Sequence, residues 1–233
     1  MNGFFVTGTD TGVGKTVVTA GLALAFVARG RSVAVVKPVQ SGNLARDPAG
    51  DAMRLKTLAG LAADPAEIVR SAFPEPLAPL VAARLAGAAI DPRALVEHVH
   101  AAAMGHDLVL VEGAGGLLVP LAEDWTIADL ASALGLPLLV VARPLLGTVN
   151  HTLLTIRAAE QHGLTCAGVV FNGRADDASA LTNAELIEQF GRVPVLGRVP
   201  WHVGELSSAR LLALVERNLD VERLLPAEAH VSP

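Results

Sequence analysis

A glycine-rich turn near the N-terminus, "TGTDTGVGKT" at residues 7–16, holds side chains whose types and spacing suit phosphate chemistry. Gly12 and Gly14 let the backbone turn its N–H groups toward one point, and a helix predicted to begin near Lys15 directs its positive end at that point. Lys15 can then reach the terminal phosphates of a nucleotide, and the Thr16 hydroxyl can ligate Mg²⁺. A turn without a ligand would explain the glycines but not the Lys-Thr pair, so the stretch predicts a phosphate-binding loop.

The loop departs by one residue from the common pattern G-x-x-x-x-G-K-[ST]. Counting back from Gly14, that pattern places its first glycine at position 9, where the chain has Thr9 and carries Gly8 one step earlier. The regular spacing is lost, but the short glycine turn into a helix is kept. The physical basis for binding an anion therefore remains.

Two acidic residues are candidates to complete a magnesium site with Thr16. Glu112 follows the apolar run "DLVLV", which predicts a strand over 107–111, and Asp51 opens the helical pattern "DAMRLKTLAG". Magnesium that bridges nucleotide phosphates takes oxygen ligands, commonly one or two carboxylates plus water. The plain alternatives are a polar strand end for Glu112 and a first-turn helix acid for Asp51.

Lys37 and Ser41 follow a second predicted strand, "SVAVV". Pro38 favours extended geometry next to Lys37. A lysine that faces the phosphate loop from this edge of the sheet can neutralise charge on a transferring phosphoryl group, whereas an ordinary surface lysine is the alternative. Ser41 lies in the small polar loop that follows and can donate a hydrogen bond to a substrate anion.

Short apolar runs alternate with helical patterns along the chain, which predicts an α/β fold with a doubly wound, mostly parallel sheet and helices on both faces. The predicted strands cover 3–7, 32–36, 107–111, 137–142, 166–171 and a short 193–196. The predicted helices cover 15–29, 51–60, 78–87, 91–104, 126–134, 149–162 and 179–190. No repeat or linker divides the chain, so one domain over 1–233 is expected, with a weakly patterned, frayed tail at 225–233. Ligands of such sheets bind beyond the carboxyl ends of the strands, where the polar and glycine-rich segments gather.

The composition disfavours several classes of function. The formal net charge is −5 without a basic block, so nucleic-acid binding is not expected. The best apolar runs, near 20–28 and 133–142, are shorter than the roughly 20 residues of a membrane span. A single cysteine, Cys166, excludes an internal disulfide and fits a reducing compartment. We therefore expect a cytoplasmic protein that binds neither nucleic acid nor membrane.

Seven motifs in order resemble the ATP-dependent dethiobiotin synthetase family, which has a P-loop NTPase-like fold. The resemblance runs from Phe4 to about Trp201 and rests on "VTGTDTGVGKT", "KPVQSG", "GDAMRL", "FPEPLAPLVAA", "VEGAGGLLVPL", "LGTVNHTLLT" and "VPW". The early Gly8 is itself a feature of that family's loop. The resemblance implies a ligase that uses ATP, Mg²⁺ and CO₂ to convert 7,8-diaminononanoate into dethiobiotin, through a carbamate and a carbamic–phosphoric anhydride.

The resemblance also implies a role for each matching residue. Metal ligands are expected to be Thr16, Asp51 and Glu112. Catalytic contacts are expected from Lys15, Lys37, Thr11 and Ser41. The implied nucleotide site, in which Asn172 reads the adenine edge, consists of Gly12, Val13, Gly14, Lys15, Thr16, Val17, Asp51, Glu112, Gly113, Ala114, Gly115, Asn172, Gly173, Pro200, Trp201 and His202. The implied substrate site consists of Thr11, Lys37, Ser41, Leu146, Gly147, Thr148 and Asn150. The segment from Leu146 to Asn150 is expected to receive the substrate carboxylate of a neighbouring subunit, which predicts a homodimer with composite sites.

Two departures and three alternatives accompany this interpretation. Gly12 stands where some relatives carry an acidic residue, and Arg143-Pro144 replaces a different short loop. The main alternative is a regulatory switch ATPase of the partitioning type, whose hallmark lysine, five positions before the loop lysine, is here Asp10. A corrin amidotransferase synthetase would need a glutaminase cysteine in another context. A bare binding module would leave the set of lysines and acids without a purpose.

Overall fold

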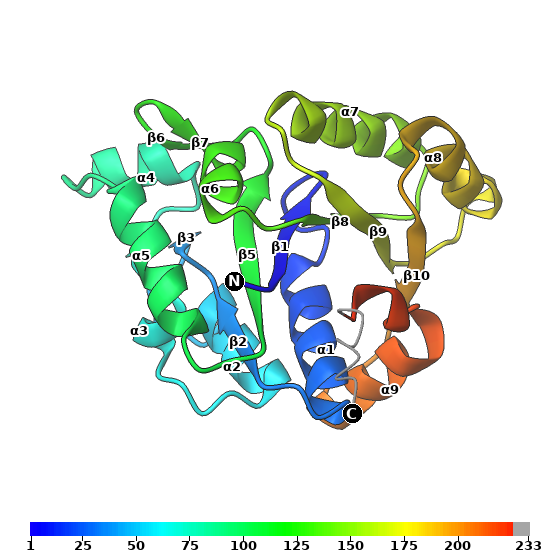
Figure 1. Ribbon diagram of the computed structural model, residues 1–233, viewed down its shortest axis with the longest axis horizontal. Coiled ribbons are helices and arrows are strands. Elements are labelled where there is room, and N and C mark those ends of the chain that lie inside the picture. Colours follow the sequence, from blue (N-terminus) through cyan, green and yellow to red (C-terminus); the bar gives the residue numbers. More distant parts are fainter. Residues whose placement is uncertain (226–233) are drawn as a thin grey trace, which may run out of the picture.

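The computed structural model describes residues 1–225, so the tail predicted to fray lies outside the described residues except at its first position. A six-stranded sheet with the order β10-β9-β8-β1-β5-β2 runs through the molecule (Figure 1), and every pairing in it is parallel. Its strands are β1 (Gly3–Gly8), β2 (Val33–Val36), β5 (Leu108–Gly116), β8 (Leu138–Ala142), β9 (Cys166–Gly173) and β10 (Val195–Pro200). The predicted fold class is confirmed.

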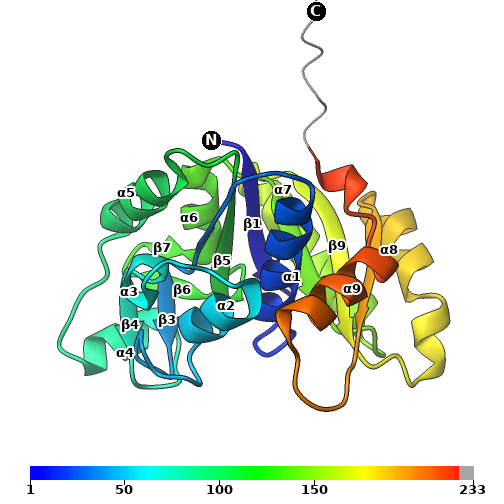
Figure 2. The same cartoon turned by 90° about the horizontal axis from the view of Figure 1, so that it is seen from below.

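Successive residues of the central strands point to opposite faces of the sheet, and both faces are covered. Phe4 and Val6 of β1 belong to one hydrophobic cluster, whereas Phe5 belongs to the other. The first cluster lies under α1 (Lys15–Ala28), α2 (Asp51–Ala59) and α9 (Ser208–Asn218), which lie side by side in Figure 2. The opposite face is covered by α5 (Pro92–Ala103), α6 (Ile127–Leu134), α7 (Thr148–Gln161) and α8 (Asn183–Gly191). Burial on both faces explains why the strands are continuous apolar runs.

Shorter elements extend the sheet edge near β2 and β5. A parallel pair joins β3 (Val39–Ser41) to β4 (Ser71–Phe73), and an antiparallel pair joins β6 (Pro120–Ala122) to β7 (Trp125–Thr126). The helices α3 (Pro65–Ile68) and α4 (Pro79–Leu85) accompany them. Within residues 1–225, no helix is long and apolar enough to cross a membrane.

Three differences from the predicted elements have physical reasons. The strand predicted to stop at residue 111 continues to Gly116, because β5 stays paired with β1 as far as the Gly8–Gly116 pair. Glu112 is therefore part of the strand instead of following it. The strand predicted at 193–196 is β10, which begins and ends later. The helix α9 was not predicted, although its buried Leu211 and Val215 are four residues apart, on the face that packs against α1.

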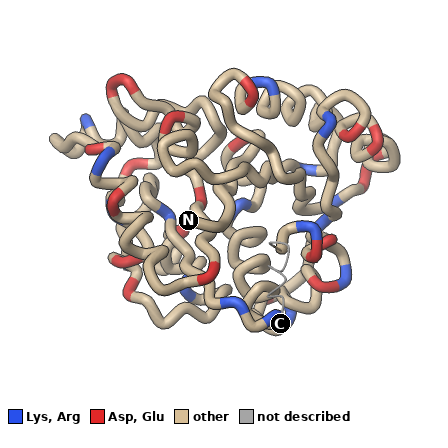
Figure 3. The backbone as a smooth tube through the Cα atoms, in the orientation of Figure 1, with Lys and Arg blue, Asp and Glu red and all other residues tan. Residues whose placement is uncertain are grey.

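Most Lys, Arg, Asp and Glu residues lie around the outside of the molecule in Figure 3, and a few blue and red segments lie near its centre. Lys37, directly after β2, and Glu112, within the second half of β5, are charged residues at the carboxyl edge of the sheet. The edge is formed by the residues that end β1, β2, β5, β8 and β9. The chain leaves β1 toward β2 on one side of the sheet, whereas it leaves the neighbouring strand β5 toward β8 on the other side, so the connections after β1 and β5 run in opposite directions. This is the topological switch point at which open α/β sheets bind ligands.

Candidate active site

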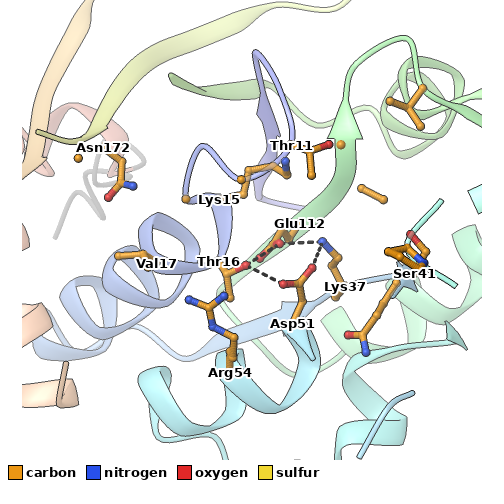
Figure 4. Close-up of a pocket in the computed structure, with 18 of the residues that line it drawn as sticks. Thr11, Lys15, Thr16, Val17, Lys37, Ser41, Asp51, Arg54, Glu112 and Asn172 are labelled. Atoms are coloured by element: carbon orange, nitrogen blue, oxygen red, sulfur yellow. Dashed lines mark hydrogen bonds and ion pairs between the residues drawn. The ribbon is translucent and has the colours of Figure 1, made fainter. Parts of the chain in front are cut away.

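A cavity of about 900 Å³ opens at this edge and brings together most of the predicted site residues (Figure 4). Its wall includes the phosphate loop, the ends of β2, β5 and β9, and the first turn of α2. Predicted site residues that line it are Thr11, Gly12, Gly14, Lys15, Thr16, Val17, Lys37, Ser41, Asp51, Glu112, Ala114, Gly115, Asn172, Gly173, Pro200, Trp201 and His202. The segments that carry these residues are far apart in the sequence, and parallel strand order alone makes them neighbours.

The phosphate loop ends at Gly14, which forms the N-cap of α1 with φ 96°. A side chain there is excluded twice, by that left-handed backbone and by Asn172, whose Nδ2 would lie 2.0 Å from an added Cβ. Asn172 Nδ2 donates a hydrogen bond to the Val13 carbonyl at 3.0 Å, so the end of β9 holds the loop. Arg143 holds it from the other side by donating to the Thr11 carbonyl at 3.2 Å.

Lys15 folds back over the loop and is only 6% exposed. Its Nζ donates to the Asp10 carbonyl at 3.2 Å. Burial, followed by the nearby charge of Lys37, lowers the pKa of Lys15 to about 8. The ammonium is therefore held in a site that disfavours it, and an anion placed beside it would relieve that cost.

Lys37 is the centre of a buried charge cluster. Its side chain is 2% exposed, and its Nζ lies 2.7 Å from Glu112 Oε1 and 2.9 Å from Asp51 Oδ2. A third bond, at 3.0 Å, goes to the Gly113 carbonyl. Burial alone would lower the pKa of Lys37, but the two carboxylates raise it above its ordinary value. Lys37 is thus a permanent cation whose three donors are all used.

Thr16, Asp51 and Glu112 present oxygen atoms that fit a magnesium ion. Thr16 Oγ1 lies 3.0 Å from Glu112 Oε1 and 3.3 Å from Asp51 Oδ1, yet a hydroxyl has one proton to donate. Glu112 Oε2 is buried without a hydrogen-bond partner. No group of three or more His, Cys, Asp or Glu in residues 1–225 is placed to hold a metal. The set therefore fits an ion that shares its coordination with phosphates.

The hydroxyl group of Ser41 does not have the hydrogen-bonding role that the sequence predicted, which was to donate to a substrate anion. Its Oγ donates to the Leu77 carbonyl at 2.7 Å, so its proton is not free for a substrate anion. The remaining lone pairs can accept a hydrogen bond from an amine. Beside it the cavity wall becomes apolar, formed by Pro76, Leu77, Ala78, Pro79 and Val119. This end of the cavity suits a ligand with an amine and an aliphatic chain.

The predicted segment from Leu146 to Asn150 does not line the cavity. Leu146 is 85% exposed, and Gly147 precedes α7 as its N-cap with Thr148 as the first helical residue. Thr148 Oγ1 is buried without a partner. Val13 and Gly113 do not line the cavity either. Val13 is buried, and the Gly113 carbonyl accepts a hydrogen bond from Lys37.

Sequence reasoning missed the apolar wall named above and two polar residues of the cavity. Gln40 is buried inside the "KPVQSG" segment, and Arg54 lies one helical turn after Asp51. The spacing of Arg54, three residues beyond an expected metal ligand on a helix, was a usable signal. Gln40 gave none, because its role depends on a loop that the sequence does not position.

Comparisons with known proteins agree on a family. A family model described as "AAA domain" matches residues 2–207. The chain is 44% identical over 226 residues to the ATP-dependent dethiobiotin synthetase BioD of Bacillus cereus (strain B4264), covering 96% of this chain and 93% of the relative. The corresponding protein of Bacillus thuringiensis (strain Al Hakam) matches with the same identity and coverage.

Solved structures with lower identity show the fold alone. A ParA family ATPase from Chlorobium tepidum TLS aligns with a TM-score of 0.56 at 18% identity, covering 96% of each chain. The cell division ATPase MinD of Pyrococcus furiosus aligns with a TM-score of 0.54 at 20% identity, covering 93% of this chain and 99% of that one. Both likenesses concern the α/β fold of this chain and carry no assignment of function.

Lys15→Met is expected to stabilise the ligand-free protein at pH 7. The folded state loses the Lys15 proton near pH 8, whereas the unfolded chain keeps it to about 10.5, so below pH 8 folding carries the full cost of burying the ammonium. That difference corresponds to up to about 3 kcal/mol. Urea unfolding of both proteins should show a gap in the free energy of unfolding at pH 7 that closes as the pH approaches 10.5. A gap that is absent at pH 7, or independent of pH, would contradict the assigned pKa.

Proposed function

The chain belongs to the ATP-dependent dethiobiotin synthetase family, and from this premise we propose that it closes a cyclic urea on 7,8-diaminononanoate with CO₂ and ATP, a step of biotin synthesis. The proposal covers residues 1–233 as one catalytic domain. It is supported by the 44% identity and by the cavity, in which a phosphate loop and an apolar wall face each other across the Lys37 cluster.

The proposed reaction has three steps. An amine nitrogen adds to the carbon of CO₂ and loses a proton, which gives a carbamate. A carbamate oxygen then attacks the γ-phosphorus of ATP, and the bond from that phosphorus to the bridging oxygen breaks with release of ADP. The second amine attacks the carbonyl carbon of the mixed anhydride, and phosphate leaves with the electron pair of the C–O bond as the amine loses its proton. All the reacting groups belong to the substrates.

The residues of the chain orient these groups and neutralise charge. Backbone N–H groups of the loop from Gly12 to Thr16 face the phosphates, and Lys15 reaches their terminal oxygens. Lys37 is held as a cation, so it cannot act as a base and instead stabilises the negative charge on the carbamate and the transferring phosphoryl group. Mg²⁺, held by Thr16, Asp51 and Glu112, would supply charge neutralisation and orientation at the phosphates.

The single observation that carries the proposal is the position of Lys37, whose ammonium lies between the two carboxylates in the wall of the cavity that the phosphate loop and Ser41 also line. A ligase that joins two substrates through a phosphorylated intermediate needs a cation where they meet, and no protein nucleophile. Cys166 does not supply one, because burial raises the pKa of its thiol to about 11 and it begins β9 at the opposite end from the cavity.

We assign the adenine end of the nucleotide to Asn172 and the turn from Pro200 to His202. One Nδ2 hydrogen of Asn172 is used by Val13, which leaves a second donor and the amide oxygen for a base edge. Trp201 is exposed beside the cavity, and the Arg174 guanidinium lies 5.4 Å from its ring centroid. The turn thus offers an aromatic surface at the cavity rim.

We also propose that two copies of the chain form a dimer with shared substrate sites. The segment that the family uses for the substrate carboxylate lies outside the cavity of its own subunit. It nevertheless has the features of an anion site, because the N-terminus of α7 begins at Thr148 and the buried Thr148 hydroxyl has no partner. A neighbouring subunit's substrate would reach it across a two-fold axis.

Phosphate release from ATP tests the proposed function. With Mg²⁺, bicarbonate and 7,8-diaminononanoate all present, we expect phosphate release and a product heavier than the diamine by one carbonyl and lighter by two hydrogens. Omitting the diamine or the bicarbonate should stop the release. Phosphate release that is unchanged when the diamine or the bicarbonate is omitted would contradict the ligase activity and favour a switch ATPase.

Lys37→Met is expected to lower kcat by about 10²-fold or more, because it removes positive charge that acts on the transition state. The change leaves the buried Glu112 carboxylate and the partly exposed Asp51 carboxylate without their cationic partner, so it is also expected to lower the stability of the fold. Stability should therefore be measured beside kcat, by urea unfolding with and without Mg²⁺. The matched control is Arg46→Met, which removes an exposed cation that pairs with Asp64. A folded Lys37→Met protein with near-wild-type kcat would remove Lys37 from the mechanism.

A further inference from the structure

The helix that carries Asp51 begins without a local cap. Gly50 is the N-cap of α2 and has no side chain to accept from the first N–H groups, and Asp51 is the first helical residue. Unpartnered N–H groups at a helix start normally bind a capping side chain or water. The position of the Asp51 carboxylate therefore depends on what fixes this first turn from outside.

Gln40 supplies the missing cap from another element. It lies on β3, is 1% exposed, and its Oε1 accepts from the Ala52 N–H at 2.8 Å. Ala52 is the second helical residue, whose N–H a local cap would ordinarily bind. Its Nε2 donates to the carbonyls of Asn43 at 2.9 Å and Leu44 at 3.1 Å. Gln40 thus binds the helix through a buried hydrogen bond and the connecting loop through two partly buried ones.

We propose that Gln40 is a positioning residue of the active site: as a remote cap of α2, it sets the Asp51 carboxylate against Thr16 and Lys37. Its action on the metal rests on the proposed function, in which Asp51 is a magnesium ligand. Gln40 itself touches neither Lys37 nor Asp51 through the bonds described, so its effect is transmitted through the first turn of the helix.

The chain segment from Lys37 to Gln40 explains why the cap comes from β3. Lys37 directly follows β2 and binds the Asp51 carboxylate, and three residues later Gln40 binds the helix that presents this carboxylate. One short segment therefore fixes both partners of the ion pair. Gly50 leaves room for this arrangement, because an added Cβ would lie 2.6 Å from Gln40 Nε2.

The test compares the wild-type protein with Gln40→Met, which keeps the side-chain volume but removes the three hydrogen bonds. Two readouts do not depend on catalysis. Amide hydrogen exchange at Ala52, measured without metal or nucleotide, should accelerate. The dissociation constant of Mn²⁺, measured by electron paramagnetic resonance with ADP bound, should rise between about twofold and thirtyfold, the range produced by losing a helix cap. In kinetic assays, half-saturation by Mg²⁺ should rise by a similar factor while KM for the diamine stays unchanged.

A matched control separates positioning from general destabilisation. Asp91→Ala removes a cap of the same kind, because Asp91 accepts from the second helical N–H of α5, at Arg93, away from the cavity. It should lower the melting temperature but leave Mn²⁺ binding unchanged. A rescue variant, Gln40→Ala with Gly50→Ser, replaces the remote cap by a local one. The backbone of Gly50, φ −74° and ψ 153°, suits a serine, and with Gln40 shortened the nearest neighbours of its Cβ are Asn43 Cβ at 3.1 Å and the Asp47 carbonyl at 3.2 Å, on a loop that needs to shift by only a few tenths of an ångström. It should recover most of the Mn²⁺ affinity.

Three results would overturn the proposal. The first is Mn²⁺ binding by Gln40→Met that is as tight as in the wild type while Ala52 exchanges faster. The second is Mn²⁺ binding that Asp91→Ala weakens equally. Failure of the rescue variant to recover affinity would also contradict a capping role. A wild-type protein that binds no Mn²⁺ with ADP would instead remove the proposed metal site itself, and that failure is recognised without any variant.

Discussion

The buried ammonium of Lys37 is the interaction on which the site depends. A charge on a side chain that is only 2% exposed is tolerated when opposite charges and hydrogen bonds surround it, and Glu112, Asp51 and the Gly113 carbonyl provide them. These partners come from β5 and α2, whereas Lys37 comes from the end of β2. The ion pairs of Lys37 thus keep the end of β2, the interior of β5 and the start of α2 close together, and the phosphate loop lies beside them.

The parallel sheet explains how residues that are far apart in the sequence meet at this point. Each strand delivers its last residues to the same edge, and the switch point beside β1 leaves the edge open as a cavity. The acids that hold Lys37 are also the expected ligands of Mg²⁺, together with Thr16. With two carboxylates and a hydroxyl, the protein supplies part of a coordination shell, and nucleotide phosphates would complete it. Under the proposed function, the metal, the nucleotide and Lys37 would therefore be coupled through Asp51 and Glu112.

Sequence patterns predicted a mostly parallel sheet, the alternation of strands and helices along the chain and most of the polar residues in the cavity wall. Glycines, apolar runs and polar residues at strand ends are local signals, which is why these features could be predicted. What they missed depends on distant contacts. Glu112 lies within a strand because β5 stays paired with β1. The Ser41 hydroxyl donates its hydrogen bond to the Leu77 carbonyl, and the Gln40 amide donates to two loop carbonyls, those of Asn43 and Leu44. The short pairs β3–β4 and β6–β7 were also missed, since two or three residues carry no periodicity. The burial of Lys37 could not be predicted from its position in the sequence alone. Because Lys37 is buried and paired, its substitution is expected to affect stability as well as kcat.

The central claim is that this cluster phosphorylates a carbamate. The most direct measurement follows the oxygen of CO₂, with the reaction run on ¹⁸O-labelled bicarbonate and the released phosphate examined by mass spectrometry before label is lost to exchange. The account predicts phosphate that carries one ¹⁸O atom per turnover, because the attacking carbamate oxygen stays on phosphorus when the ring closes. Unlabelled phosphate, formed while the diamine is consumed, would mean that water or another oxygen attacks ATP, and the proposed use of Lys37 would be wrong.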